Sequence, residues 1–151
     1  MLKLQELTPA ELTIQEKESI LNHAIDLHLI GSDEVDDPGF DIVEKGSPRA
    51  VHILRLVNIN QHVGIMYILQ REAENHFEMT ILVHKEFRGK HLTADAVDAL
   101  EQFMSRTHKS PVYLCASVRE HNPLRHELTA FLLRHGYTYS SEEQAFIKQV
   151  V

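Results

Sequence analysis

Short runs in which apolar and polar residues alternate predict most of the β-strands of this chain, because successive side chains along a strand point to opposite faces. Alternation begins in residues 2–7 and returns in three runs between residues 50 and 83. The turn residues Asn58-Ile59-Asn60 separate the first two of these runs, residues 50–57 and 63–70, and predict a hairpin. The third run, residues 76–83, has one apolar face formed by Phe77, Met79, Ile81 and Val83. Its other face carries His76, Glu78, Thr80 and Leu82.

Apolar residues at helical spacing predict three helices. The first is expected to begin at Thr8-Pro9-Ala10-Glu11, because Thr8 can cap a helix, Pro9 is tolerated in its first turn and Glu11 can bond back to the cap. Gly31 is its expected end. The second covers residues 92–106, with an apolar stripe of Leu92, Ala96, Ala99, Leu100 and Phe103. The third ends at Gly136, and its expected buried face consists of Leu124, Leu128, Phe131, Leu132 and His135.

The remaining segments complete the order β-α-loop-β-β-β-α-β-α-β. Residues 31–48 are rich in Gly, Pro, Ser and Asp and predict a long loop. Residues 112–118 predict a strand, and residues 137–150 predict one or two closing strands. This order predicts an α/β protein of the α+β type, with a single mixed, mostly antiparallel central sheet flanked by helices. No repeat or linker interrupts the chain, so we expect a single domain over residues 1–151.

Charge and composition exclude several function classes. The formal net charge of −7 disfavours nucleic acid as a partner, since binding a duplex requires a basic face. No apolar run is long enough for a membrane helix and the first residues contain no leader-like apolar core, so we expect a cytoplasmic protein without a membrane partner. The single cysteine, Cys115, can form no internal disulfide. The histidines show no spacing that places two on one helix face, so no metal site is expected.

One stretch suggests a binding site, because Arg88-Gly89-Lys90 lies between the strand that ends at Val83 and the following helix. The first backbone N–H groups of a helix lack partners and carry partial positive charge, so a Gly-containing turn with two cations can hold a phosphate. The segment contains neither the GxxxxGK[ST] of a P-loop nor the GxGxxG of a dinucleotide-binding fold. From the residues alone, a basic loop with Thr93 as helix cap fits equally well.

The element order, together with "ILVHKEFRGKHL" and "TAFLLRHGY", resembles the GCN-related N-acetyltransferase (GNAT) superfamily. That family has a strand ending in valine, a turn of the form Arg/Gln-x-x-Gly-x-Gly/Ala before a helix, and a later helix closing in Gly-Phe or Gly-Tyr. Val83, Arg88 and Gly136-Tyr137 stand at the matching places. The resemblance covers nearly the whole chain in element order, and residues 77–137 in residue identity. His91-Leu92-Thr93 replaces the motif's Gly-x-Gly/Ala, and neither His91 nor Thr93 needs a positive φ if the helix has already begun there.

The resemblance implies acetyl-CoA as co-substrate and no metal. The pyrophosphate is expected on the backbone of the turn, formed by Arg88, Gly89, Lys90, His91, Leu92 and Thr93. The pantetheine arm is expected to pair with the strand backbone at Ile81, Leu82 and Val83, as an added strand would. Asn122 and Arg125 are the expected contacts of the nucleotide half. The alternative for Asn122 is to cap the helix ahead of Pro123.

For the reaction, the resemblance implies direct transfer of the acetyl group to a primary amine. The Val83 backbone N–H is the expected donor to the tetrahedral oxyanion. Glu78 is the first candidate for the base that deprotonates the amine. The alternative for Glu78 is a solvent-facing carboxylate on a half-exposed strand. Second-choice bases are Glu120 and His121, and His76 comes third.

The acid that helps the thiolate leave is commonly a tyrosine of the last helix in this family, and here Leu132 takes that place. Tyr113 is the candidate acid instead, and Cys115 and Ser117 share its strand face as alternatives. Tyr137 is expected in the core, as the family's phenylalanine is.

The implied acceptor is a small-molecule or peptide amine, selected by the first helix, the loop of residues 31–48 and the closing strands. Acidic residues in that loop could favour a polyamine, an aminoglycoside or a lysine. The alternative function is a non-catalytic acyl-CoA-binding or regulatory domain on the same scaffold, because the tyrosine and the motif glycines are missing. Domains of this family often pair through sheet edges or last strands, so a homodimer is compatible with the resemblance.

Overall fold

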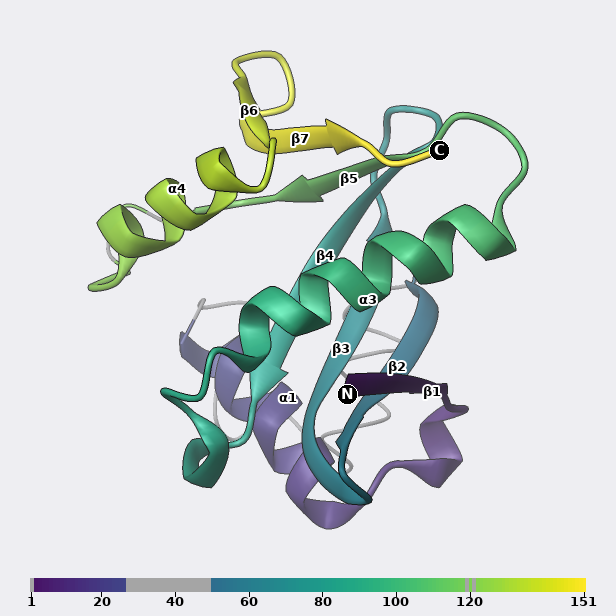
Figure 1. Cartoon of the computed structure of the whole chain (residues 1–151), viewed down its shortest axis with the longest axis vertical. Helices are drawn as coiled ribbons and strands as arrows, with labels where there is room; N and C mark the ends of the chain where they lie inside the picture. The colour runs from purple at the N-terminus through teal and green to yellow at the C-terminus, as the bar shows by residue number, and fades with distance from the viewer. Residues whose placement is uncertain (1, 27–49, 119, 121) are drawn as a thin grey trace.

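A single seven-stranded sheet forms the centre of the molecule in the computed structural model, which describes residues 2–26, 50–118, 120 and 122–151 (Figure 1). Its strand order is β1-β2-β3-β4-β5-β7-β6, and only β4 and β5 are parallel neighbours. The expected mixed, mostly antiparallel sheet flanked by helices is therefore confirmed. The strands are β1 (Leu2–Glu6), β2 (Ala50–Asn58), β3 (Gln61–Gln70), β4 (His76–Val83), β5 (Tyr113–Ala116), β6 (Thr138–Ser140) and β7 (Ala145–Gln149). The α-helices are α1 (Ile14–Asp26), α3 (Leu92–Thr107) and α4 (Arg125–Arg134), and the 3-10 turns are η1 (Pro9–Glu11) and η3 (Lys85–Phe87).

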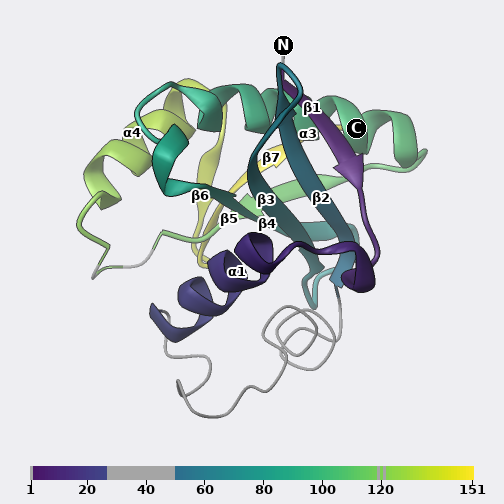
Figure 2. The ribbon, with the colours of Figure 1, turned by 90° about the horizontal axis from the view of Figure 1, so that it is seen from below.

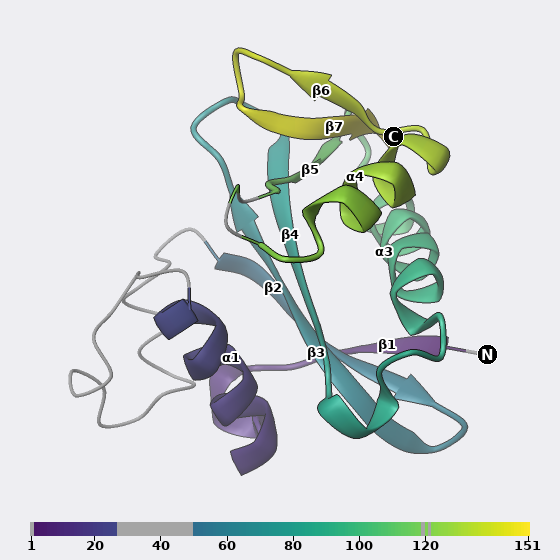
Figure 3. The ribbon, with the colours of Figure 1, turned by 90° about the vertical axis from the view of Figure 1, so that its left-hand side faces the viewer.

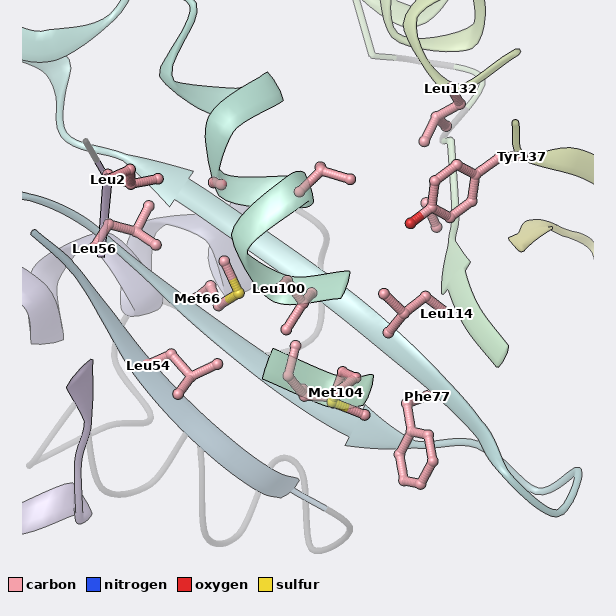
Figure 4. Packing of buried hydrophobic residues seen from close by; sticks show 14 of the residues in the cluster. Leu2, Leu54, Leu56, Met66, Phe77, Leu100, Met104, Leu114, Leu132 and Tyr137 are labelled. Carbon is pink, nitrogen blue, oxygen red and sulfur yellow. The ribbon is translucent and has the colours of Figure 1, made fainter. Parts of the chain in front are cut away.

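Helices cover both faces of the sheet, with α1 on one face and α3 and α4 on the other (Figures 2 and 3). Residues 63–68 of β3 are all buried, as expected for a strand covered on both sides. The larger hydrophobic cluster packs against α3 and α4, and its members include Leu54, Met66, Leu100, Met104 and Leu114 (Figure 4). The smaller cluster includes Ile20 of α1 together with Ile53, Ile65 and Tyr67 of the sheet.

The predicted hairpin is confirmed, because β2 pairs with β3 across a two-residue turn. The turn residues Ile59 and Asn60 have φ angles of 49° and 62°. Two consecutive left-handed residues are typical of the I′ turn, whose twist matches that of the flanking strands.

The predicted start of the first helix was wrong, although the predicted cap exists. The Thr8 N–H donates to Glu11 Oε1 at 2.9 Å, but this bond closes only the short turn η1. A second pair caps α1, with the Thr13 N–H donating to Glu16 Oε1 at 2.9 Å and the Glu16 N–H to Thr13 Oγ1 at 3.1 Å. Two T-x-x-E motifs follow each other within nine residues, and only the second opens the helix. The expected stop at Gly31 and the expected loop of residues 31–48 lie outside the described residues.

The later elements follow the prediction with smaller differences. Helix α3 begins at Leu92 as expected, β5 is shorter than the expected strand, and two closing strands form. Leu124 was expected in the buried face of α4 but is 63% exposed, so that expectation was wrong. The cause is local: Leu124 lies in a turn before the helix, where its N–H donates to Asn122 Oδ1 at 2.9 Å. None of the helices in the described parts of the chain is both long and apolar enough to cross a membrane.

Candidate functional site

The parallel strands β4 and β5 pair over only part of their length. Their register has three pairs, from His76 opposite Tyr113 to Glu78 opposite Cys115. Beyond Glu78 the strands diverge toward their carboxyl ends (Figure 1). The second half of β4, residues 79–83, therefore has β3 on one side and, among the described residues, no strand on the other.

Backbone hydrogen bonds show which groups of β4 face this gap. The His84 N–H donates to the Val63 carbonyl at 2.8 Å, and the His76 carbonyl accepts from the Arg71 N–H at 2.8 Å. Bonding to an antiparallel neighbour alternates along a strand, so the even-numbered residues of β4 bond to β3. The N–H and carbonyl groups of Met79, Ile81 and Val83 consequently point toward the gap, where an extended ligand could pair with them.

Gly64 brings β3 unusually close to the end of β4. A Cβ atom at this position would lie 2.5 Å from the Leu82 carbonyl oxygen and 3.1 Å from the Val83 Cα. Both of these atoms belong to the backbone, which cannot turn aside as the nearby Leu56 side chain, 2.9 Å from the same Cβ position, could. Glycine at residue 64 therefore permits the close approach of β3 to the strand end that carries the candidate oxyanion donor.

The turn after β4 delivers the chain to α3 through two left-handed residues. Gly89 has a φ of 81°, and His91, the N-cap of α3, has a φ of 60°. His91 was expected to need no positive φ if the helix had begun there, but α3 begins one residue later and the φ of His91 is positive. The alternative that Thr93 caps the helix was wrong, since Thr93 lies inside α3. The His91 side chain makes no capping bond. The first N–H groups of α3 therefore have no side-chain acceptor at the N-cap position, which suits an anion.

Arg88 and Lys90, the two cations of the turn, are exposed, and their side chains contact the end of β4 and the turn η3. Arg88 Nε donates to the Val83 carbonyl at 3.1 Å. Lys90 Nζ lies 5.5 Å from the centre of the Phe87 ring. Arg88 thus contacts one of the backbone groups that the gap exposes, which links the expected pyrophosphate turn directly to the expected oxyanion strand.

Glu78 lies in an ion-pair network at the paired end of β4. Its Oε1 accepts from Arg71 Nη1 and, at 2.8 Å, from the Ser117 hydroxyl. Arg71 also donates to the Glu143 backbone carbonyl at 2.6 Å. Five residues of strand separate Glu78 from Val83, or about 16 Å. The solvent-facing alternative does not describe Glu78, because its side chain is only 22% exposed and is paired.

Tyr113 lies at the closed end of the β4–β5 pair. Its ring stacks on that of His76, with 4.6 Å between ring centres. Because His76 is seven residues before Val83, Tyr113 is roughly 23 Å from the Val83 amide. This position does not favour Tyr113 as an acid in a reaction at Val83.

The comparisons with known proteins agree on the architecture. No protein-family model matches the sequence, and no curated protein matches it either. An acyl-CoA N-acyltransferase from Pseudomonas aeruginosa superposes with a TM-score of 0.55 at 21% identity, over 97% of each chain. An aminoglycoside 6'-N-acetyltransferase, solved with coenzyme A, gives a TM-score of 0.63 at 13% identity, over 98% of this chain and 97% of the other. A GNAT-family acetyltransferase from Staphylococcus aureus Mu50 gives 0.61 at 12% identity, over the full length of both chains.

The chain has the GNAT fold. The resemblance in element order is therefore confirmed at the level of architecture. At these identities the likeness does not extend to the roles of individual residues.

Two positions of this GNAT fold belong to the core. Leu132 of α4 is 1% exposed, and Tyr137 is fully buried as expected. The Tyr137 hydroxyl donates to Glu101 Oε2 at 3.0 Å. Burial, together with the Glu101 carboxylate, raises the pKa of Tyr137 above its ordinary value. Leu132 has no proton to donate and the buried Tyr137 hydroxyl donates to Glu101, so neither position favours an acid at the gap.

At the start of α4, Asn122 and Arg125 bond within their own turn. Asn122 Oδ1 accepts from the Leu124 N–H in the turn before α4, but the N-cap of α4 is Leu124, so the alternative that Asn122 caps the helix was wrong in position. Arg125 Nη1 donates to the Glu120 carbonyl at 3.1 Å. Arg125 and Glu120 line a cavity of about 460 Å³ between α4 and the last two strands. His121, a second-choice base, lies outside the described residues.

The sequence analysis missed His84, which directly follows Val83 in this GNAT fold. It is 3% exposed, and its ring contacts Ser19 of α1. The available signal was its even number in the extended chain that continues β4, because this parity places the ring on the same face as Leu82 and hence toward α1. The described part of the chain holds no cluster of three or more His, Cys, Asp or Glu residues suited to a metal ion.

Proposed function

We propose that this protein is an N-acetyltransferase that moves an acetyl group from acetyl-CoA to a primary amine by direct attack. One observation carries the proposal: residues 79–83, which no second strand pairs among the described residues, are joined through the short turn η3 to the left-handed turn at the start of α3. The backbone groups along the edge can pair with an extended thioester arm, and the N–H groups of the turn can bind a pyrophosphate.

Acetyl-CoA would lie along the gap between β4 and β5. The pantetheine arm pairs with the gap-facing groups of Ile81 and Val83, with Leu82 between them. The pyrophosphate binds the backbone N–H groups of residues 89–93, and Lys90 supplies charge beside them. Arg88 binds the phosphate or keeps its contact with the Val83 carbonyl. Asn122 and Arg125 at the start of α4 meet the nucleotide half.

The acetyl carbonyl would accept from the Val83 N–H, which then stabilises the oxyanion as the amine attacks. Direct attack is favoured over an acyl-enzyme because the only cysteine, Cys115, is fully buried, and burial raises its pKa to about 12. The amine must first lose a proton. Glu78 reaches it only through bridging water, given the length of strand between them. No tyrosine acid is required, since a thiolate whose conjugate acid has a pKa of about 8.5 can leave unaided.

The first test is calorimetry and thermal unfolding with acetyl-CoA, on the unaltered chain and two charge-reversal variants. Lys90→Glu places a carboxylate beside the proposed pyrophosphate, and we expect it to weaken binding about tenfold or more. Lys109→Glu makes the same change beyond the far end of α3, about 24 Å away along the helix. We expect Lys109→Glu to bind acetyl-CoA as the unaltered chain does.

A second measurement, release of free CoA thiol with a panel of amines, decides between catalysis and binding. The panel begins with aminoglycosides, because one similar structure is an aminoglycoside acetyltransferase, and continues with polyamines, lysine and a peptide N-terminus. Steady release with any of them supports the transferase. Tight binding without release favours a non-catalytic acyl-CoA-binding domain, and the absence of binding heat overturns both functions.

A further inference from the structure

His84 joins three elements at the end of β4. Its backbone N–H bonds to Val63 of β3, and its carbonyl accepts from the Phe87 N–H at 2.9 Å, which closes η3. Its ring points toward α1, where Nδ1 lies 3.3 Å from Ser19 Oγ. A second contact ties the same elements together, since Gln15 of α1 donates to Glu86 of η3 at 2.9 Å.

The other ring nitrogen of His84 is the unusual feature. Nε2 is buried and, among the described residues, is the one buried side-chain nitrogen or oxygen without a hydrogen-bond partner. Leaving such an atom unpaired costs roughly 1–3 kcal/mol. In the neutral ring only one atom is left unpaired. A protonated ring would add a positive charge and a second N–H donor at the same buried position, which costs more free energy.

Each element packed around His84 brings a charged or titratable group. Glu16 belongs to α1, Glu86 to η3, Arg88 to the following turn and His62 to β3. Burial lowers the pKa of His84 below its ordinary value, while the two carboxylates act in the opposite direction and do not cancel it. Glu16 is already paired with Arg55 at 2.7 Å, so it is not free to receive a proton from the ring.

We propose that His84 is a positioning residue that in its neutral form fixes the end of β4 against α1, and that adding a proton to its ring loosens this contact and displaces the Val83 amide. Val83 is its immediate neighbour in the chain, so a displacement of the His84 backbone is passed to the strand end that carries the gap-facing Val83 amide. The effect of this movement on the reaction rests on the proposed function, in which the Val83 N–H is the oxyanion donor.

The direction of the pH effect follows from linkage. When the pKa in the folded chain is lower than in the unfolded chain, the stabilisation is complete above the unfolded value near 6.5 and is lost as the pH falls from there toward the folded value. Within that window one extra proton binds to the unfolded chain, so the unfolding equilibrium constant rises up to about tenfold per pH unit.

The experiment compares the full chain with His84→Asn, whose δ atom can keep the Ser19 contact but which has no Nε2 and no charge at any pH. His126→Asn, on the exposed surface of α4, is the control. Urea unfolding is followed between pH 5 and 8, together with the affinity for acetyl-CoA by calorimetry. We expect the unaltered chain and the control to lose stability and acetyl-CoA affinity together below pH 6.5. We expect His84→Asn to lose this part of the pH dependence.

Unfolding curves of His84→Asn that retain the full pH dependence overturn the proposal. Should the variant fail to fold, an NMR titration of the ring in the unaltered chain decides, since titration at or above pH 6.5 also overturns it. If acetyl-CoA binds at no pH, the proposed function fails, but the unfolding curves still test His84. A loss of stability at low pH without loss of acetyl-CoA affinity overturns the link to Val83.

Discussion

His91 is the residue at which the candidate site carries backbone strain. A side chain at a φ of 60° costs roughly 1–2 kcal/mol, which glycine does not incur. The ring of His91 is exposed and makes no capping bond that would offset this cost. A glycine at this position would also open the first turn of α3 to a bound anion.

We therefore expect His91→Gly to raise the free energy of unfolding by about 0.5–1 kcal/mol, after allowing for the greater flexibility of glycine in the unfolded chain. Urea denaturation measures this change, and calorimetry with acetyl-CoA measures binding, which we expect to become tighter. His91→Ala is the matched control, because it removes the ring but keeps a Cβ at the same φ. Equal stability of the two variants would contradict the assignment of strain to the backbone.

At this scale the sequence predicted positions better than conformations. The turn around Arg88 and Gly89 was correctly located, since glycine and charge between a strand and a helix are local signals. The left-handed state of His91 left no signal, because it depends on how far α3 extends toward the strand. The contact between Arg88 and the Val83 carbonyl was also missed, because it joins a side chain to a backbone group five residues earlier and depends on the path of the turn between them.

Among the elements, α1 is held at its N-terminus by the capping box of Thr13 and Glu16. Its capping box brings Glu16 into the protein, where the carboxylate pairs with Arg55 of β2. Burial alone would raise the pKa of Glu16, but hydrogen bonds from Arg55 and Thr13 outweigh it and hold the pKa below the ordinary value. The N-terminus of α1 is thereby fixed to the sheet on the side that also holds His84.

Thr13→Ala removes the hydroxyl that accepts the Glu16 N–H, and we expect a loss of about 1 kcal/mol in the free energy of unfolding. Thr8→Ala removes the hydroxyl that donates to Glu11 Oε1 in the exposed turn η1, and we expect a change within about 0.5 kcal/mol. Urea denaturation followed by circular dichroism compares the two. A larger loss for Thr8→Ala would show that the first motif, not the second, begins the helical structure.

The sequence could not choose between these two motifs because both have the same local chemistry. What separates them is Arg55, 39 residues after Glu16, whose side chain pairs with the Glu16 carboxylate but bonds Glu11 at its backbone carbonyl. Strands were easier to predict, since alternation along β2, β3 and β4 is a property of each strand by itself. The divergence of β4 from β5 was not predictable from alternation, because it depends on where the pairing ends.

For the whole molecule, the central strands are the most protected part. Cys115 of β5 is fully buried and lies between β4 and β7, opposite Glu78 on one side and Ile147 on the other. Burial raises its pKa to about 12, so only on the order of one thiol in ten thousand would be ionised at pH 8.

We expect Cys115 in the folded chain to resist a disulfide reagent such as DTNB at pH 8, and to react with a stoichiometry of one thiol per chain once urea unfolds the protein. The labelling rate below the urea transition then reports opening of the sheet. Complete labelling within seconds in native buffer would contradict the burial of this strand.

The gap between β4 and β5 has a further consequence for the solution behaviour of the protein. Residues 79–83 are Met-Thr-Ile-Leu-Val, a segment of high β-propensity without charge, proline or glycine. Such a segment, with one edge unpaired among the described residues, can pair with an extended segment of another molecule. A ligand bound in the gap would therefore block this pairing and reduce aggregation of the protein at high concentration.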